Sequence, residues 1–167
     1  MDKEGLVVLK ATVSRQIEEI EKLYFRIEDR KQKRGKSGIE SLAYQLHNLY
    51  CAFEDLFKIV ADTFDNHIQN KTHYHIELLK RMTITIEGIR PALISQENYE
   101  LLDNLRAFRH LFRHAYSYEL DERKIKIVLA DAIKLKKRYQ DDINIFLKSI
   151  EGKRSSPVGS HRTDDEN

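Results

Sequence analysis

The sequence predicts an all-α protein, a bundle of four long helices plus a short helix, and three observations point to that fold class. Apolar residues recur at steps of three and four through long segments rich in Leu, Ile, Lys, Glu and Arg, which is the helical period. No segment shows the alternation of apolar and polar residues that is typical of strands. Glycines and prolines are few, six and two in 167 residues, and most of them lie at three places that divide the chain.

The first two predicted helices, over residues 5–30 and 39–65, each carry one broad apolar side. Between them, residues 31–38 (KQKRGKSG) are basic and interrupted by glycine, so we expect a loop with Ser37 as the cap of the second helix. A basic loop of this kind is either solvated or a contact for phosphate.

Three further helices and a tail complete the predicted architecture. A short helix is expected over 75–87, a longer one over 95–116 and the last over 121–150, where apolar residues again follow the helical period. Beyond this point the chain is small, polar and charged, a composition that cannot repay the entropy of ordering. We therefore expect one helical domain over 1–150 and a flexible polar tail over 151–167.

Composition and charge limit the classes of function. Lys and Arg number 29 against 27 Asp and Glu, a net charge of +2, which excludes a uniformly basic, histone-like chain. Cys51 is the only cysteine and cannot form an internal disulfide, so we expect a reducing compartment, the cytoplasm. No apolar run approaches the roughly 18 residues that cross a bilayer, and we expect no membrane partner.

The segment 104–118 (NLRAFRHLFRHAYSY) contains three arginines, two histidines and no acidic residue. At about 100° per residue, these cationic and titratable residues lie opposite an apolar side. One interpretation is a solvated helix face, and the other is a surface for an anion such as RNA or a nucleotide. The absence of acidic residues favours the anion-binding surface, because a solvated face in a chain this rich in Glu and Asp would contain charges of both signs. The residues concerned are Arg106, Arg109, His110, Arg113 and His114.

A metal site is the competing interpretation of the histidines. His110 and His114 stand four residues apart, as two ligands on one helical turn do, and His73 and His75 could supply further ligands. Three nearby arginines would repel a divalent cation, and no acidic residue accompanies the pair. We therefore expect no metal and no other cofactor.

Residues 109–116 (RHLFRHAY) resemble the motif of the HEPN superfamily and, within it, of the HepT-type toxins that pair with minimal nucleotidyltransferase antitoxins. The motif is an arginine, a polar residue, three further residues, a histidine, one residue and a tyrosine, near the end of a late helix. The resemblance implies a HEPN-like domain that acts as a metal-independent endoribonuclease and as a homodimer, with two motif copies facing one cleft. It also implies that the antitoxin adenylylates Tyr116 and so blocks the binding of RNA.

The same resemblance assigns catalysis to Arg109 and His114, and the chemistry of the side chains agrees. A histidine titrates near neutral pH, so His114 is suited to move the proton of the ribose 2′-hydroxyl or of the leaving oxygen. Arg109 would hold the phosphate and its growing charge, and cleavage would leave a cyclic phosphate and a free 5′-hydroxyl. Arg106, His110 and Arg113 would bind the RNA or support the site.

An ideal helix places Arg109 and His114 about 140° apart, so the two side chains cannot easily share one phosphate in a straight helix. Either the helix bends or ends near His114, or a second chain completes the site.

Two alternatives to the ribonuclease remain: a non-catalytic HEPN module that binds a nucleotide or assists a nucleotidyltransferase, and a structural protein whose basic helix meets an acidic partner. The joint presence of arginine, histidine and tyrosine at the family spacing favours the ribonuclease.

Overall fold

The computed structural model describes residues 1–64, 73–114 and 120–152, which form six helices around one apolar core. Among these residues the only β pairing is a single bridge between Ile86 and Arg90, and the predicted all-α fold is confirmed. The helices are α1 (Lys3–Arg30), α2 (Gly35–Phe64), α3 (Tyr74–Met82), α4 (Gln96–Arg113), α5 (Glu122–Lys136) and α6 (Tyr139–Gly152).

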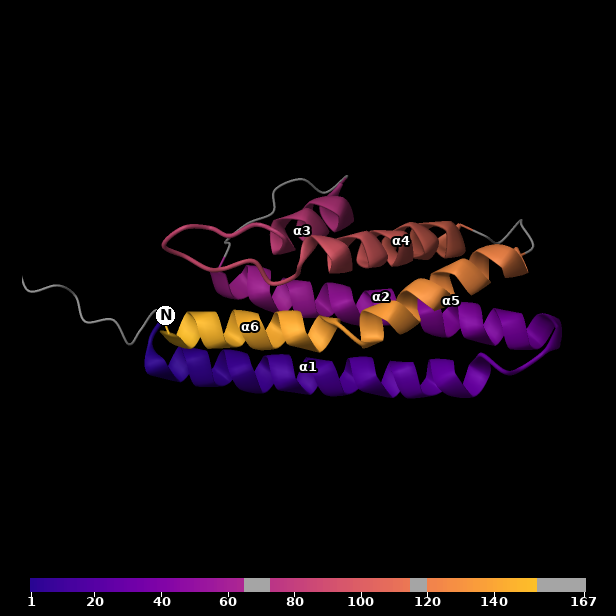
Figure 1. Ribbon diagram of the computed structural model, residues 1–167, viewed down its shortest axis with the longest axis horizontal. Coiled ribbons are helices and arrows are strands. Elements are labelled where there is room, and N and C mark those ends of the chain that lie inside the picture. The colour runs from indigo at the N-terminus through magenta and orange to yellow at the C-terminus, as the bar shows by residue number, and fades with distance from the viewer. Residues whose placement is uncertain (65–72, 115–119, 153–167) are drawn as a thin grey trace, which may run out of the picture.

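α1 and α2 form a long antiparallel hairpin against which the other helices pack (Figure 1). The connection between them is short because Gly35 adopts a φ of 80°, which L side chains rarely adopt. Gly38 approaches the backbone of Lys33 so closely that an added Cβ would lie 2.8 Å from it. α2 therefore begins within the basic segment that the sequence predicted as a loop, and Ser37, the expected cap, lies in its first turn.

The last helix expected from the sequence is divided into α5 and α6 by a turn over residues 137–138. α6 runs antiparallel beside α1 (Figure 1). The Tyr139 hydroxyl at the start of α6 donates a hydrogen bond to Glu21, and Lys10 pairs with Glu151 near the other end. α6 thus packs against α1 while α5 continues in a different direction.

A single carboxylate joins the start of α4 to α6. Oδ2 of Asp142 accepts hydrogen bonds from the backbone N–H and the hydroxyl of Ser95, at 2.7 and 2.9 Å, and from the side-chain amide of Asn98 at 2.6 Å. Ser95 is also the N-cap of α4. Because Asp142 lies in the first turn of α6, its charge interacts favourably with that helix dipole as well.

α3 is shorter than predicted, and an irregular connection over residues 83–95 follows it. This connection folds around Arg90, whose side chain is fully buried. The Arg90 guanidinium donates hydrogen bonds to the carbonyl oxygens of Arg81, Ile84 and Pro91, at 3.0 to 3.2 Å. The charge is therefore used to bond carbonyl oxygens at the end of α3 and in the irregular connection.

None of the helices in the described residues has both the length and the apolar character to span a bilayer. The tail predicted over 151–167 lies outside the described residues, except for its first two residues, which form the end of α6.

Candidate nucleic-acid interface

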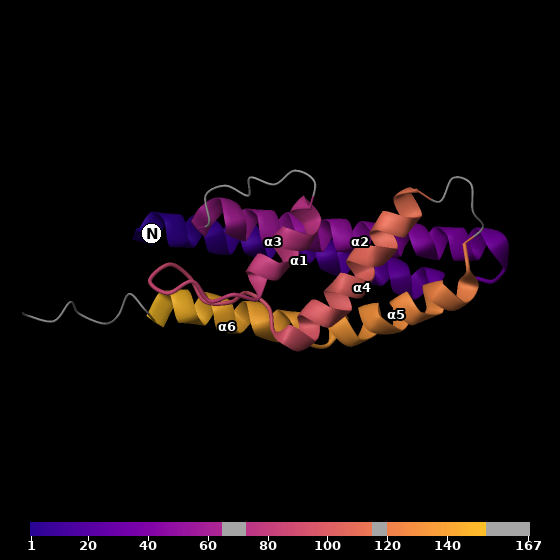
Figure 2. The ribbon, with the colours of Figure 1, turned by 90° about the horizontal axis from the view of Figure 1, so that it is seen from above.

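α4 packs against both α2 and α5, and its C-terminal half lies over the middle of α2 (Figure 2). Leu102, Leu105 and Phe108 are buried on its inner side, at the spacing of a helix period. The sequence predicted an apolar side of α4 and a cationic side opposite to it. The observed burial agrees with that division and leaves His110, Arg113 and His114 exposed.

The predicted site residues differ in exposure. His110, Arg113 and His114 are exposed, whereas Arg106 and Arg109 are partly buried. The rings of His110 and His114 lie next to each other, with centroids 4.8 Å apart. Tyr116, the predicted adenylylation acceptor, lies outside the described residues. The structure therefore brings one histidine pair and one exposed arginine together at the end of α4.

α4 ends at Arg113, and His114 is its C-cap, with φ −106° and ψ 8°. The backbone N–H of His114 donates to the carbonyl oxygen of Leu111 at 3.1 Å, a bond that closes the last turn. The helix is thus shorter than the predicted range of 95–116. The sequence left two arrangements in which Arg109 and His114 could act on one phosphate: a helix that bends or ends near His114, or a site completed by a second chain. The structure shows that α4 ends near His114.

Cationic side chains at this place also favour the helix itself. His110 and Arg113 lie in the last turn of α4, where the dipole carries a partial negative charge. That same partial charge opposes the approach of an anion along the helix axis. A phosphate at this end would therefore depend on arginine and histidine side chains, because the C-terminal turn of a helix presents carbonyl oxygens and not free N–H groups.

Arg106 is engaged within its own helix. Its Nε donates to Oδ1 of Asp103 at 2.7 Å, and its side chain is 19% exposed. The acid-free segment of the sequence begins immediately after Asp103, so the sequence pattern did not reveal this pairing. Arg106 is consequently less accessible to RNA than Arg113.

Two residues of α2, His47 and Tyr50, lie near the motif and were not singled out from the sequence. The His47 ring lies 5.1 Å from the Phe112 ring. Among the described residues, Nε of Arg109, Nδ1 of His47 and the Tyr50 hydroxyl are all buried without a hydrogen-bond partner. The only sequence signal for His47 is its spacing of four residues from Cys51, whose sulfur lies 3.8 Å from its Nε2.

The electrostatic surroundings keep both α2 residues neutral at pH 7. Burial lowers the pKa of His47 below 6.5, and the positive charges of Arg109 and Arg113 lower it further. Burial raises the pKa of Tyr50 well above its ordinary value, and the carboxylate of Glu54 adds to that effect. Neutral, polar side chains therefore lie beneath the cationic end of α4.

His75, one of the histidines considered as an additional metal ligand, lies against a carboxylate of α2. Nδ1 of His75 is hydrogen-bonded to Oε2 of Glu54, a buried carboxylate on α2 that also pairs with Lys58 at 3.4 Å. In the described part of the chain, no group of three His, Cys, Asp or Glu side chains is arranged to hold a metal ion.

Comparison with known proteins identifies a family. No curated protein and no solved structure matches the chain. The sequence profile of a family described as HepT-like protein matches residues 41–150. These residues make up more than half of the chain and contain α3 to α5 and the whole 109–116 motif, while α1 and the basic connection lie before them. A match of this extent, on an all-α fold that carries the motif at the end of α4, shows that the chain belongs to the HepT-like family and is a HepT-type protein of the HEPN superfamily.

Proposed function

We propose that this protein is a toxin of a toxin–antitoxin pair, a metal-independent endoribonuclease that cleaves RNA at the end of α4. The observation that carries the proposal is the placement of His114. Its side chain is exposed at the C-cap of α4 and forms no hydrogen bond or ion pair among the described residues. A histidine that is exposed next to Arg113, on the same helix end as Arg109, suits proton transfer at a phosphodiester.

The reaction is an internal transfer at phosphorus. The ribose 2′-oxygen forms a bond to the adjacent phosphorus, the bond from phosphorus to the 5′-oxygen breaks, and a cyclic phosphate and a free 5′-hydroxyl result. His114 accepts the proton of the 2′-hydroxyl or returns one to the leaving oxygen. Arg109 holds the phosphate and its growing negative charge, since a guanidinium offers a fixed fork of donors.

The first test is incubation of the purified protein with total cellular RNA in excess chelator. We expect fragments with cyclic phosphate ends from the unaltered protein, and a loss of at least about 100-fold in the rate for His114→Ala, the effect of removing a general acid or base. His110→Ala is the matched control, since this exposed histidine is the neighbour of His114, and we expect a smaller loss. Equal rates for His114→Ala and the unaltered protein would contradict the assignment, and no cleavage at all would favour the non-catalytic binding module.

Control by a partner is the second part of the proposal. We infer that a minimal nucleotidyltransferase antitoxin transfers adenylyl groups to the hydroxyl of Tyr116. Tyr116 follows His114 by two positions in the sequence, so the added phosphate would compete with RNA for the same arginines.

The acceptor is tested by mass spectrometry after incubation with the cognate nucleotidyltransferase and ATP. Tyr116→Phe is expected to show no added adenylyl mass, because the variant lacks the acceptor oxygen. Tyr118→Phe, which changes a tyrosine outside the motif, is expected to be modified like the unaltered protein. Modification of both variants to the same extent would exclude Tyr116 as the acceptor.

A further inference from the structure

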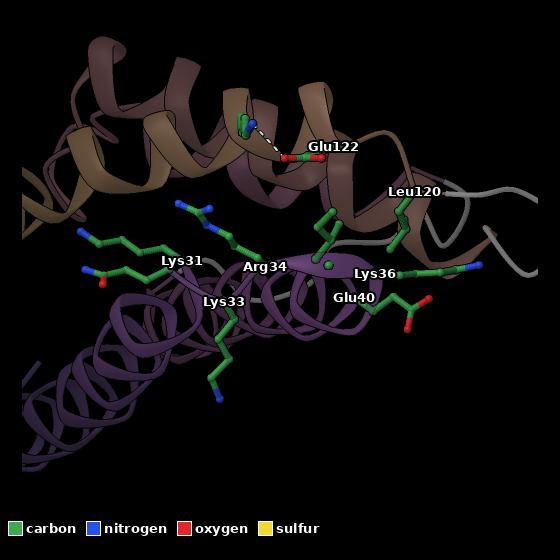
Figure 3. A pocket seen from close by; sticks show the side chains of 11 residues that line it. Lys31, Lys33, Arg34, Lys36, Glu40, Leu120 and Glu122 are labelled. Atoms are coloured by element: carbon green, nitrogen blue, oxygen red, sulfur yellow. Dashed lines mark ion pairs between the residues drawn. The ribbon is translucent and has the colours of Figure 1, made fainter.

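A groove with a volume of about 910 Å³ lies between the connection of α1 to α2 and the start of α5 (Figure 3). The connection comes from the basic segment that the sequence left open as either solvated or a contact for phosphate. The cationic side chains of the groove outnumber its two acids, Glu40 and Glu122. The cationic side chains are Lys31, Lys33, Arg34, Lys36 and Lys126.

The charges of the groove are only partly neutralised. Glu122 is paired with Lys126 of its own helix at 2.8 Å, as the dashed line in Figure 3 shows. Arg34 forms no ion pair in the described part of the chain, and its guanidinium extends from the connection toward α5 (Figure 3). The first turn of α2, which also lines the groove, contains no acidic residue. Lys31 and Lys33 pair with Glu28 and Asp29, two acids of α1 outside the groove lining, at 2.5 and 3.5 Å. Among the described residues, the positive charge that no ion pair offsets is therefore carried by Arg34.

The groove and the motif lie at the same end of the molecule. The C-terminal end of α4, the N-terminal end of α5 and the connection from α1 to α2 are all found there (Figures 1 and 2). Leu120, which lines the groove, follows the motif residue Tyr116 by only four positions. A long ligand held at the end of α4 therefore has a second cationic surface close by.

We propose that this groove binds the sugar–phosphate backbone of the RNA substrate on one side of the bond that is cleaved. The proposal rests on the proposed function, since it takes the same RNA as the ligand. In Figure 3 Lys31, Arg34 and Lys36 follow one another along the groove, whereas the side chain of Lys33 points away from α5. Such a spread suits successive phosphates of a chain, whereas a single nucleotide is held by a few convergent groups in a more enclosed pocket.

The apolar residues of the groove are consistent with the same ligand. Ile39 and Leu120 line it beside the cations, and they offer contact to sugars and bases without reading a sequence. Backbone binding of this kind depends on charge and is independent of sequence. The groove would thus increase affinity and orient the RNA, and the motif would perform the reaction.

The test compares two double variants that remove the same charge. Arg34→Ala/Lys126→Ala alters both walls of the groove, and Lys3→Ala/Lys148→Ala alters two exposed lysines at the opposite end of the molecule. The probe is a labelled, fully 2′-O-methylated RNA, which binds but cannot be cleaved. Fluorescence anisotropy gives the dissociation constant at salt concentrations between about 50 and 200 mM.

Each lost phosphate contact reduces the slope of log affinity against log salt by about 0.7 for a single strand, so the groove variant should lose about 1.4 of that slope. The lysine control should keep the full slope. In cleavage assays the groove variant should show a raised KM with an unchanged kcat. The groove binds the substrate and the transition state equally, so its loss weakens RNA binding and leaves the reacting groups intact.

The two proposals fail separately. An unaltered protein that does not cleave RNA refutes the proposed function, whereas a slope change in the groove variant still supports the groove. Cleavage by the unaltered protein together with equal slopes for the two double variants refutes the groove alone. The groove variant could instead keep the full salt slope of RNA binding while it binds the antitoxin more weakly or sediments differently from the unaltered protein. Either result would assign the surface to protein contacts and overturn the proposal.

Discussion

Arg109 is partly buried, whereas His110, Arg113 and His114 of the same motif are exposed. Nε of Arg109 is buried beside α2, while the residue as a whole remains partly exposed. The alkyl part of an arginine in this position packs against its surroundings, so truncation to alanine would remove packing as well as charge. A lysine keeps the alkyl chain and the charge and loses only the planar fork of donors.

We therefore expect Arg109→Lys to stay folded and to lose about 100-fold or more in kcat/KM for RNA cleavage, the usual effect of removing a donor to the transition state. Arg113→Lys changes an exposed arginine on the same helix and is expected to lose less than about tenfold. Cleavage kinetics on a defined RNA measure both. Equal losses in the two variants would mean that Arg109 has no special role.

His47 makes the stability of the protein depend on pH. Its pKa is lower in the folded chain than in the unfolded chain, because burial and the charges of Arg109 and Arg113 disfavour the protonated ring. The unfolded state then binds more protons, so the contribution of His47 is complete above its unfolded pKa of about 6.5 and is lost as the pH falls below it.

In thermal denaturation followed by circular dichroism, the Tm of the unaltered protein should therefore fall more steeply from about pH 7 to about pH 5 than the Tm of His47→Gln. Groups that titrate in both proteins cancel in the difference between the two curves. Parallel curves would show that His47 is not responsible.

At the scale of the element, α4 is fixed at both ends. Asp142 holds its start against α6, and the contact between His47 and Phe112 holds its last turns against α2. The exposed end of the helix, with Arg113 and His114, thus projects from a well-supported helix. Such support favours a reaction that needs fixed distances between groups.

The connection between α3 and α4 depends on one buried arginine. Arg90→Met keeps the length of the side chain but leaves the carbonyl oxygens of Arg81, Ile84 and Pro91 without this donor. We expect the free energy of unfolding in urea to fall by about 3 kcal/mol, since buried acceptors lose charged partners. Arg123→Met, at a side chain that is 90% exposed, should change it by less than about 0.5 kcal/mol. Similar effects of both substitutions would refute a structural role for Arg90.

At the scale of the whole molecule, the homodimer that the resemblance implies makes a prediction of its own. If the active site takes Arg109 from one copy and His114 from the other, a mixed dimer of an Arg109→Lys chain and a His114→Ala chain contains one intact site. The two chains carry different tags, and the mixed dimer is purified through both of them.

We expect the mixed dimer to recover about half of the activity of the unaltered dimer, because one of its two sites is complete. Each altered homodimer should stay at its low level in the same RNA cleavage assay. A mixed dimer that is no more active than the two homodimers would place Arg109 and His114 of each site within one chain.

Boundaries of several elements could not be predicted from the sequence, and the reasons are tertiary. The short α3 gives way to a connection whose backbone groups are satisfied by Arg90, which no local pattern distinguishes from a solvated arginine. The predicted final helix is interrupted before Tyr139, and the next turn contains Asp142, which is bonded to the start of α4. Helical periodicity continues through such a break, because it records only which residues are buried.

The sequence by itself determined the helical fold, the HepT-like family and the cationic end of α4, since each depends on the local spacing of residues along the chain. The tertiary structure alone decided which distant residues surround that end. It placed His47 and Tyr50 of α2 beside the motif and brought the basic connection at Arg34 opposite Lys126 to form a groove. Residues far apart in the chain become neighbours only when the helices pack, and packing depends on all of their apolar sides together.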